Sequence, residues 1–297
     1  MTDTAFYAHH TPASDPGRHG ALLAALDPDA ESMPKPICGL MTHPMLAAMD
    51  GIMLSDRQDQ DRQARTMRAI LARLLERDAR PLDRRRDETG RFYGVCRDHA
   101  LFGAAVLRQH GRPARLRVGF ADYFTPGFLE DHWVCEVWHD GSWRLVDMQL
   151  DAAAMVRFAI GFPASDVPRD RFLTAPEAWL AMRRGTVDGW RMGVSQIAIA
   201  GSWFAAGSVA RDAAALAGIE LLPWDYWGEP DRYGNDPALL ERRLGEIDAL
   251  AEELAGDRAG HAAARRALAA RDWLGLPTRV TSYEGPDDPA VWVELPR

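Results

Sequence analysis

Apolar residues recur with helical spacing over residues 97–110, next to a cysteine. The positions that share one face at a period of 3.6 residues are Cys96, Ala100, Gly103, Ala104 and Leu107. Gly111 and Pro113 follow, and this combination stops a helix. The pattern therefore predicts a helix whose first turn holds Cys96.

A pattern of period two follows the helix. Residues 114–119 alternate as a strand, and Asp140-Gly141 lies between two runs rich in Trp and Val. An Asp-Gly pair in that setting predicts a two-residue β-hairpin loop. His139 then pairs with Ser142, so the numbers of paired residues sum to 281.

This register places a histidine near a carboxylate. It sets His132 opposite Gln149 and makes Asp147 the diagonal neighbour of His132 on the same face, roughly 7 Å away at Cβ. Cys135 has the opposite parity and points through the other face of the hairpin. The thiol expected to meet His132 is therefore that of Cys96.

Further elements follow from weaker patterns. A long amphipathic helix is expected over residues 55–77, with Met67, Ile70, Leu71, Leu74 and Leu75 as its apolar stripe. Short helices are expected over 20–26 and 175–184, and residues 193–206 lead toward a helix through 217. A helix from 235 to 256, another over 260–273, and strands over 278–283 and 290–296 complete the list.

Three side chains in this arrangement suggest nucleophilic catalysis. The unpaired N–H groups and the positive dipole end of a helix favour a thiolate at Cys96. His132 would accept the thiol proton and later deliver it, and Asp147 would fix the imidazole tautomer. The backbone N–H of Cys96 is a natural oxyanion donor.

Two segments carry a family resemblance. GVCRDHALFGAAVLRQHGRPARLRVGFA and DHWVCEVWHDGSWRLVD resemble the nucleophile helix and the His-Asp hairpin of the transglutaminase-like superfamily, a branch of the papain-like cysteine enzymes, as in its bacterial-type members. The resemblance implies acyl transfer through a thioester on Cys96. One departure is that Met148 and Gln149 follow Asp147, where the family often has Pro-Thr or Pro-Ser. Tyr93 is the candidate for the upstream oxyanion side chain.

The resemblance also implies an α+β fold, with a papain/transglutaminase-like core in which the nucleophile helix packs on an antiparallel sheet. We expect three parts along the chain. Residues 1–36 form an N-terminal arm and residues 37–151 the catalytic core. Residues 152–297 form a mostly helical C-terminal portion that completes the fold and the substrate pocket.

The expected function is cysteine-dependent acyl transfer that forms or exchanges an amide bond on a small molecule or peptide with an amide or thioester. One alternative is an amidase or peptidase that uses the same triad, and another is a non-catalytic scaffold. The loop before His132 should line one wall of the site. The expected substrate contacts are Tyr93, Asp122, Tyr123, Asp131 and Trp133, with Phe124 and the aromatic stretch 224–234 as further candidates.

The composition limits the classes of protein to which this chain can belong. The 297 residues are 47% apolar with a net charge of −8, which supports a large core and argues against nucleic-acid binding. Three cysteines far apart do not make a disulfide framework, so we expect a reducing, cytoplasmic setting. No apolar run resembles a signal peptide or a membrane span. We expect no membrane partner, and a homo-oligomer is possible.

Rival sites are disfavoured by spacing. Two pairs have the spacing of zinc ligands, Cys96 with His99 and His132 with Cys135. Residues 132 and 135, however, face opposite ways on a strand, so they cannot bind the same ion. No nucleotide or flavin fingerprint occurs, so no cofactor and no metal are expected. His99 is a rival base that lacks an evident orienting carboxylate. Cys38 is expected to be a buried apolar residue, and the three histidines His9, His10 and His19 part of a surface arm.

One charged stretch has two interpretations. The connector over residues 77–90 reads RDARPLDRRRDETG. Its arginines could bind an anionic substrate, but a solvated loop is the favoured interpretation.

Overall fold

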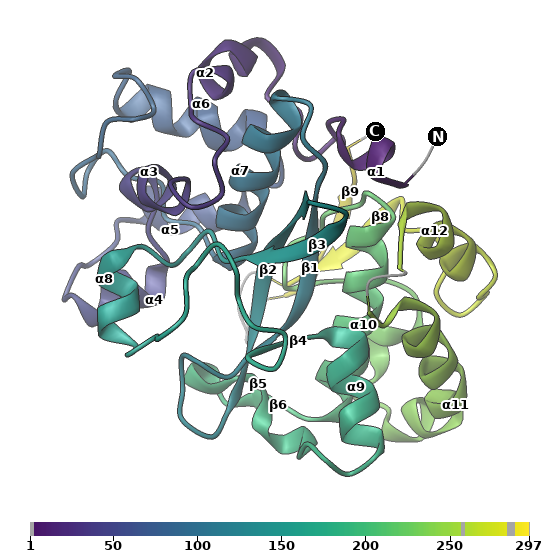
Figure 1. The fold of residues 1–297 in the computed structure, drawn as a ribbon. Helices are drawn as coiled ribbons and strands as arrows, with labels where there is room; N and C mark the ends of the chain where they lie inside the picture. The colour runs from purple at the N-terminus through teal and green to yellow at the C-terminus, as the bar shows by residue number, and fades with distance from the viewer. Residues whose placement is uncertain (1–2, 257–258, 284–288, 297) are drawn as a thin grey trace. The chain divides into compact units, whose positions relative to one another are not determined.

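The fold is described by a computed structural model that covers residues 3–256, 259–283 and 289–296 (Figure 1). It is a mixed α/β fold in which the chain forms two compact units. Unit 1 comprises residues 1–116 and 134–167, and unit 2 comprises residues 117–133 and 168–297. These units follow other boundaries than the three predicted segments, whose status as domains stays a prediction.

Unit 1 is built around the helix that begins at the cysteine, α7 (Cys96–Gln109). Helices α2, α3 and α6 pack against α7 (Figure 1). The other helical elements of unit 1 are α1 (Asp3–Tyr7), η1 (Gly17–His19), α2 (Gly20–Ala24), α3 (Pro34–Leu40), α4 (Pro44–Met49), α5 (Asp56–Asp59), η2 (Gln60–Gln63), α6 (Met67–Arg77) and α8 (Ala152–Arg157). The predicted extent of α7 is confirmed, because Cys96 is its first residue.

The N-terminal segment covers the far end of α7. The Arg108 guanidinium donates to the hydroxyls of Thr11 and Ser14 at 3.2 and 2.9 Å. The His10 ring and the Gln109 amide are 3.1 Å apart. These buried polar contacts attach the segment to the helix that carries Cys96.

The expected helix over residues 55–77 is wrong in its first half. The structure has α5 and η2 there, and a new helix, α6, starts after Thr66, whose hydroxyl accepts the Ala69 N–H at 3.2 Å. The break lets Asp61 point inward, where its side chain is fully buried and pairs with Arg77. The apolar stripe of α6 is buried as predicted, except that Leu75 is half-buried.

A six-stranded sheet has the order β4-β1-β2-β5-β6, with β3 paired to β2. It is mixed rather than antiparallel as expected, because β5 runs parallel to β2. Its strands are β1 (Ala114–Ala121), β2 (Leu129–His139), β3 (Ser142–Val146), β4 (Phe172–Thr174), β5 (Met192–Val194) and β6 (Ile199–Ala200). A second sheet has the order β7-β8-β9, formed by β7 (Asp225–Tyr226), β8 (Arg279–Ser282) and β9 (Val291–Glu294). Strands β1, β8 and β9 match the predicted runs.

The predicted hairpin register is confirmed. His139 pairs with Ser142 and Cys135 with Val146, so each pair sums to 281. Asp140 and Gly141 both have positive φ, at 49° and 85°, as the tight turn requires. The ladder stops at Val146, so Gln149 does not pair with His132 as a strand residue. Its amide N–H instead bonds to the Asp147 carboxylate at 2.9 Å, which starts a turn.

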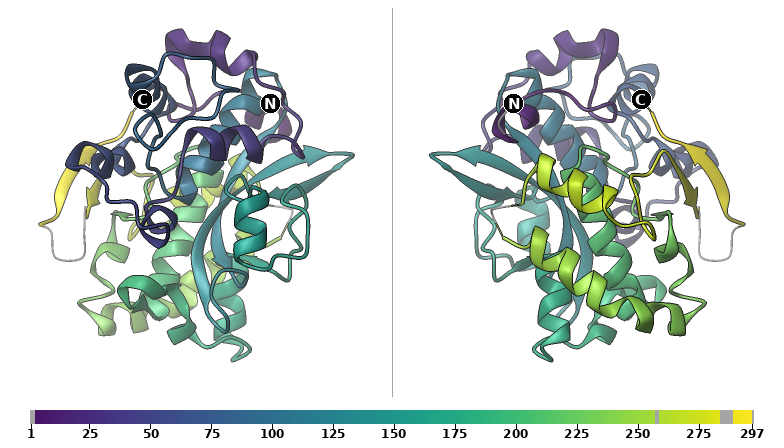
Figure 2. Two further views of the ribbon diagram at one scale, coloured as in Figure 1. Left: turned by 90° about the vertical axis from the view of Figure 1, so that its left-hand side faces the viewer. Right: turned by 90° about the vertical axis from the view of Figure 1, so that its right-hand side faces the viewer.

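Unit 2 is built around the helix α10 (Ser202–Leu216), which packs against α9 (Ala175–Arg183), α11 (Pro237–Leu254) and α12 (His261–Ala269) (Figure 2). Short helices η3 (Gly189–Arg191), η4 (Ser195–Ile197) and η5 (Glu229–Arg232) connect these elements. Asp236 caps α11, and its carboxylate accepts the Leu239 N–H at 3.0 Å. Helix α12 ends four residues before the predicted Trp273.

A buried ion pair fixes β1 to α10 within unit 2. Arg117 donates from Nε and from its terminal nitrogen to the two Asp212 oxygens at 3.0 and 2.8 Å, and both side chains are fully buried. The Val118 N–H donates to the same carboxylate at 2.8 Å. Such a bidentate geometry holds the strand at a fixed register along the helix.

Candidate functional site

The start of α7 is fixed by its own third residue. The Asp98 carboxylate accepts the Val95 N–H at 2.9 Å, and this bond caps the helix from within. The same carboxylate contacts the Arg97 guanidinium at 3.1 Å, which in turn donates to the carbonyl of Arg65 at 2.7 Å. Because the cap is rigid, Cys96 begins the helix at one defined position, with 6% of its surface exposed.

Burial raises the pKa of the Asp98 carboxyl to about 6, although the Arg97 guanidinium and the Val95 N–H act in the opposite direction. Arg97 and Asp98 are both inaccessible to solvent. Charge at the start of α7 is therefore balanced inside the protein rather than by water.

The segment before Cys96 rests on a second buried carboxylate. Asp61 accepts two hydrogen bonds from Arg77 at 2.6 and 2.8 Å and one from the Tyr93 N–H at 2.9 Å. The Tyr93 ring is fully buried and its hydroxyl donates to the Glu88 carbonyl at 2.9 Å. The phenol of this expected oxyanion residue is thus bonded to the backbone.

Asp147 lies just beyond the end of β3 and is fully buried. Its N–H donates to the Ala164 carbonyl at 2.8 Å, and its carboxylate accepts the Gln149 N–H at 2.9 Å. The first bond holds the backbone of Asp147 and the second holds its carboxylate, as an orienting residue requires.

Helix α7 packs against this turn through a glycine. A Cβ at Gly103 would lie 2.6 Å from the Met148 side chain, far inside ordinary contact. Gly103 is seven residues after Cys96, so the two share a face of α7 about 10 Å apart along the axis. Met148, where the family often has proline, therefore fills the space that Gly103 leaves beside the Asp147 turn.

Cys38 also lies near this turn, in α3, and it is half-buried rather than buried as expected. Its thiol donates to the Met148 carbonyl at 3.5 Å. Burial raises the pKa of the Cys38 thiol well above its usual range, and the nearby carboxylates of Asp151 and Asp147 raise it further. A thiol of this kind stays protonated and unreactive at neutral pH.

His132 lies on β2 in unit 2, among aromatic rings. Its ring centroid is 4.9 Å from that of Phe124, 6.0 Å from that of Tyr123 and 6.4 Å from that of Phe172, all edge-on. The imidazole is 3% exposed. Two of the aromatic residues named as substrate contacts, Tyr123 and Phe124, therefore pack on the candidate base.

The remaining expected substrate contacts, Asp122, Asp131 and Trp133, do not pack on the His132 ring in the way that Tyr123 and Phe124 do. Asp122 accepts a hydrogen bond from Arg171 at 2.7 Å. Burial raises the pKa of Asp131 to about 6, opposed by the Arg211 guanidinium. Trp133 is 1% exposed, and its indole N–H has no hydrogen-bond partner within the described part of the chain.

His99 and Cys135, the other histidine and cysteine considered for the site, lie in environments that do not suit the catalytic roles. The His99 Nδ1 lies 3.0 Å from the Val95 carbonyl, which can only accept, so this nitrogen carries a proton. Burial raises the pKa of the Cys135 thiol to about 12, and the side chain is fully buried.

Over the described ranges, no group of three or more His, Cys, Asp and Glu side chains could hold a metal ion. In the same part of the chain, no helix is both long and apolar enough to cross a membrane.

A comparison with protein families matches part of the chain. Residues 58–148 match the family model of the transglutaminase-like superfamily. This segment is a transglutaminase-like core. The core includes Cys96, His132 and Asp147, and its family generally suggests cysteine-based catalysis. Comparisons with curated proteins and with solved structures found no match.

Sequence reasoning missed the buried carboxylates that support the transglutaminase-like core. The role of Asp98 could have been found in the sequence, since an acidic residue at the third helical position can cap the backbone. The sequence carried no signal for the burial of Asp61, because this residue lies in a stretch rich in Asp, Arg and Gln that is typical of a solvated face. Its burial depends on Arg77 and Tyr93, which are distant in the sequence.

Proposed function

We propose that this protein is a cysteine acyltransferase in which Cys96 forms a thioester with the acyl group of an amide or thioester substrate. His132 takes the thiol proton and Asp147 orients its imidazole. The observation that carries this proposal is the position of Cys96 as the first residue of α7, inside the segment that matches the family model. The positive end of the helix dipole there stabilises a thiolate.

In the first half of the reaction, the Cys96 sulfur attacks the substrate carbonyl. The thiol proton passes to His132 and then to the departing amine or thiol, which leaves with it. The C–S bond of the thioester replaces the C–N or C–S bond of the substrate. The Cys96 N–H would donate to the oxyanion that develops between these steps.

In the second half, an amine or water attacks the thioester. His132 removes the proton of the attacking group and returns it to the Cys96 sulfur as the C–S bond breaks. An amine acceptor yields a new amide, and water yields an acid. An amine is our proposal for the acceptor, with hydrolysis as the competing outcome.

The test is alkylation of Cys96 by iodoacetamide from pH 5 to 9, followed by peptide mass spectrometry. Cys38 and Cys135 are internal controls, because burial raises the pKa of each thiol well above its usual range. We expect Cys96 to react fast near pH 6 and to slow severalfold or more in His132→Ala. Equal rates at all three thiols, unchanged in His132→Ala, would favour the scaffold alternative.

A further inference from the structure

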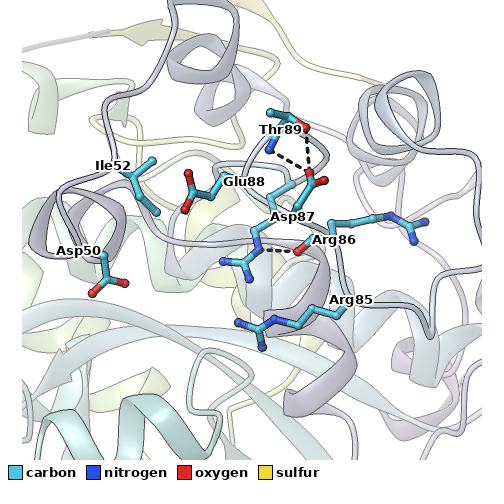
Figure 3. A pocket seen from close by; sticks show the side chains of 8 residues that line it. Asp50, Ile52, Arg85, Arg86, Asp87, Glu88 and Thr89 are labelled. Atoms are coloured by element: carbon cyan, nitrogen blue, oxygen red, sulfur yellow. Dashed lines mark hydrogen bonds between the residues drawn. The ribbon is translucent and has the colours of Figure 1, made fainter.

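A polar pocket lies in unit 1 on the segment that leads to Cys96 (Figure 3). Its volume is about 630 Å³, which falls within the range of small-molecule sites. Ile52 is the one large apolar residue in the lining, and most of the other lining residues are charged. A charged ligand is therefore favoured over an apolar one.

Several lining charges are already neutralised or bonded. Asp50 pairs with Arg157, and Arg86 pairs with Asp78 at 3.3 Å. The Asp87 carboxylate accepts the hydroxyl and N–H of Thr89 and the N–H of Gly90, and these bonds lower its pKa. None of these groups is available to a ligand without loss of its present partner.

Three charges remain. Arg85 is exposed, and its guanidinium makes no hydrogen bond or ion pair with any described residue. Arg91 is held by the Arg86 carbonyl and the Thr42 hydroxyl at 3.1 and 3.0 Å, so its position is fixed but no carboxylate neutralises it. The Glu88 carboxylate is exposed and forms no ion pair within the described ranges.

Two of these groups lie on different sides of the pocket. Figure 3 shows Glu88 near Ile52 and Asp50 on one side and Arg85 on the other. Two guanidiniums and one carboxylate match a ligand with two carboxylates and one ammonium group. Arginine binds carboxylates through paired N–H donors, and an ammonium group suits a single carboxylate.

The pocket is also linked to the proposed reaction. The Arg86 N–H donates to the Gly39 carbonyl at 2.9 Å and the Phe92 N–H to the Leu40 carbonyl at 3.0 Å, so the pocket segment is tied to the end of α3. The neighbouring residue in α3, Cys38, contacts the turn that holds Asp147.

We propose that this pocket binds a free acidic amino acid, with its two carboxylates on Arg85 and Arg91 and its ammonium group on Glu88. This binding does not depend on the proposed function of Cys96.

The experiment is calorimetric titration at low ionic strength, where charge pairs are least screened. The probes are L-glutamate, glutarate, which lacks the ammonium group, and cadaverine, which lacks carboxylates. We expect L-glutamate to bind most tightly, glutarate more weakly, and cadaverine not to bind at concentrations up to about 20 mM. Cadaverine binding as well as L-glutamate, or no binding of L-glutamate, would overturn the proposal.

Variants locate the binding. Arg85→Ala should weaken L-glutamate at least about tenfold, since a charge-assisted bond is lost, and Glu88→Gln should weaken L-glutamate but not glutarate. Arg84→Ala is the matched control, because Arg84 is an exposed neighbour that faces Asp83 outside the pocket. An equal loss in Arg84→Ala and Arg85→Ala would refute the site.

The two proposals can fail separately. The titration is repeated in Cys96→Ala, which should bind L-glutamate as the wild type does. If L-glutamate binding depends on Arg85 but Cys96 proves unreactive, the pocket proposal stands and only the proposed reaction is refuted.

Discussion

Gly103 is predicted to be required by packing, although it lies in the middle of a helix where glycine is unfavourable. Alanine at this position gains about 1 kcal/mol of helix propensity. Its Cβ would lie 2.6 Å from Met148, whereas ordinary contacts begin at 3.4 Å. Overpacking of this kind costs roughly 1–3 kcal/mol, so Gly103→Ala should be neutral to destabilising by about 2 kcal/mol.

Gly245 is the matched control. It also lies inside a helix, α11, but nothing within 4 Å would meet its Cβ. Gly245→Ala should therefore stabilise the protein by roughly 0.5–1 kcal/mol, as helix propensity alone dictates. The two variants differ in environment and not in the residue introduced.

The assay is urea denaturation of both variants, of Met148→Ala and of the double variant Gly103→Ala/Met148→Ala. Removing the Met148 side chain should make Gly103→Ala markedly less costly, with a coupling free energy of roughly 1–3 kcal/mol. Because Met148 follows Asp147, Gly103→Ala should also slow the alkylation of Cys96. If Gly103→Ala were as stabilising as Gly245→Ala, the contact between α7 and the Asp147 turn would be refuted.

Three further predictions concern buried groups. Asp212→Ala should destabilise the protein by about 3–5 kcal/mol in urea denaturation, because Arg117 is left buried and uncompensated; a loss below 1 kcal/mol would contradict this. In the folded protein the pKa of the Asp98 carboxyl is about 6, above its usual value of 3.8. The protonated carboxyl therefore stabilises the folded state fully below pH 4, and this stabilisation is lost as the pH rises through 6. Relative to Asp98→Asn, the wild type should thus lose up to about 3 kcal/mol between pH 4 and 7, and a constant difference would refute the shift. Phe124→Ala removes a ring 4.9 Å from His132 and should slow Cys96 alkylation severalfold without changing that of Cys135; an unchanged Cys96 rate would exclude a role for the ring.

Elements whose pattern depends on local signals were predictable. The Asp140-Gly141 turn fixed the hairpin register, because only a tight turn with two positive φ values joins those strands. Asp236 followed by Pro237 located the start of α11. The start of α7 at Cys96 followed from the apolar stripe and the stop at Gly111.

Features that depend on distant partners were not predictable. The helix expected over residues 55–77 breaks because Asp61 is buried against Arg77 and the Tyr93 N–H. Strand β4 has three residues, and β5 and β6 are as short, so none shows a period of two. The expected Gln149 pairing was lost because the Asp147 carboxylate bonds to the Gln149 N–H instead.

The central claim is that Cys96 carries the acyl group, and it can be tested by trapping. The protein is incubated with p-nitrophenyl acetate, quenched in acid and analysed by peptide mass spectrometry. We predict an acetyl group on Cys96 that an added amine removes, and none in Cys96→Ser or at the single lysine, Lys35. Acetylation confined to other residues, or unchanged in Cys96→Ser, would contradict the proposed thioester.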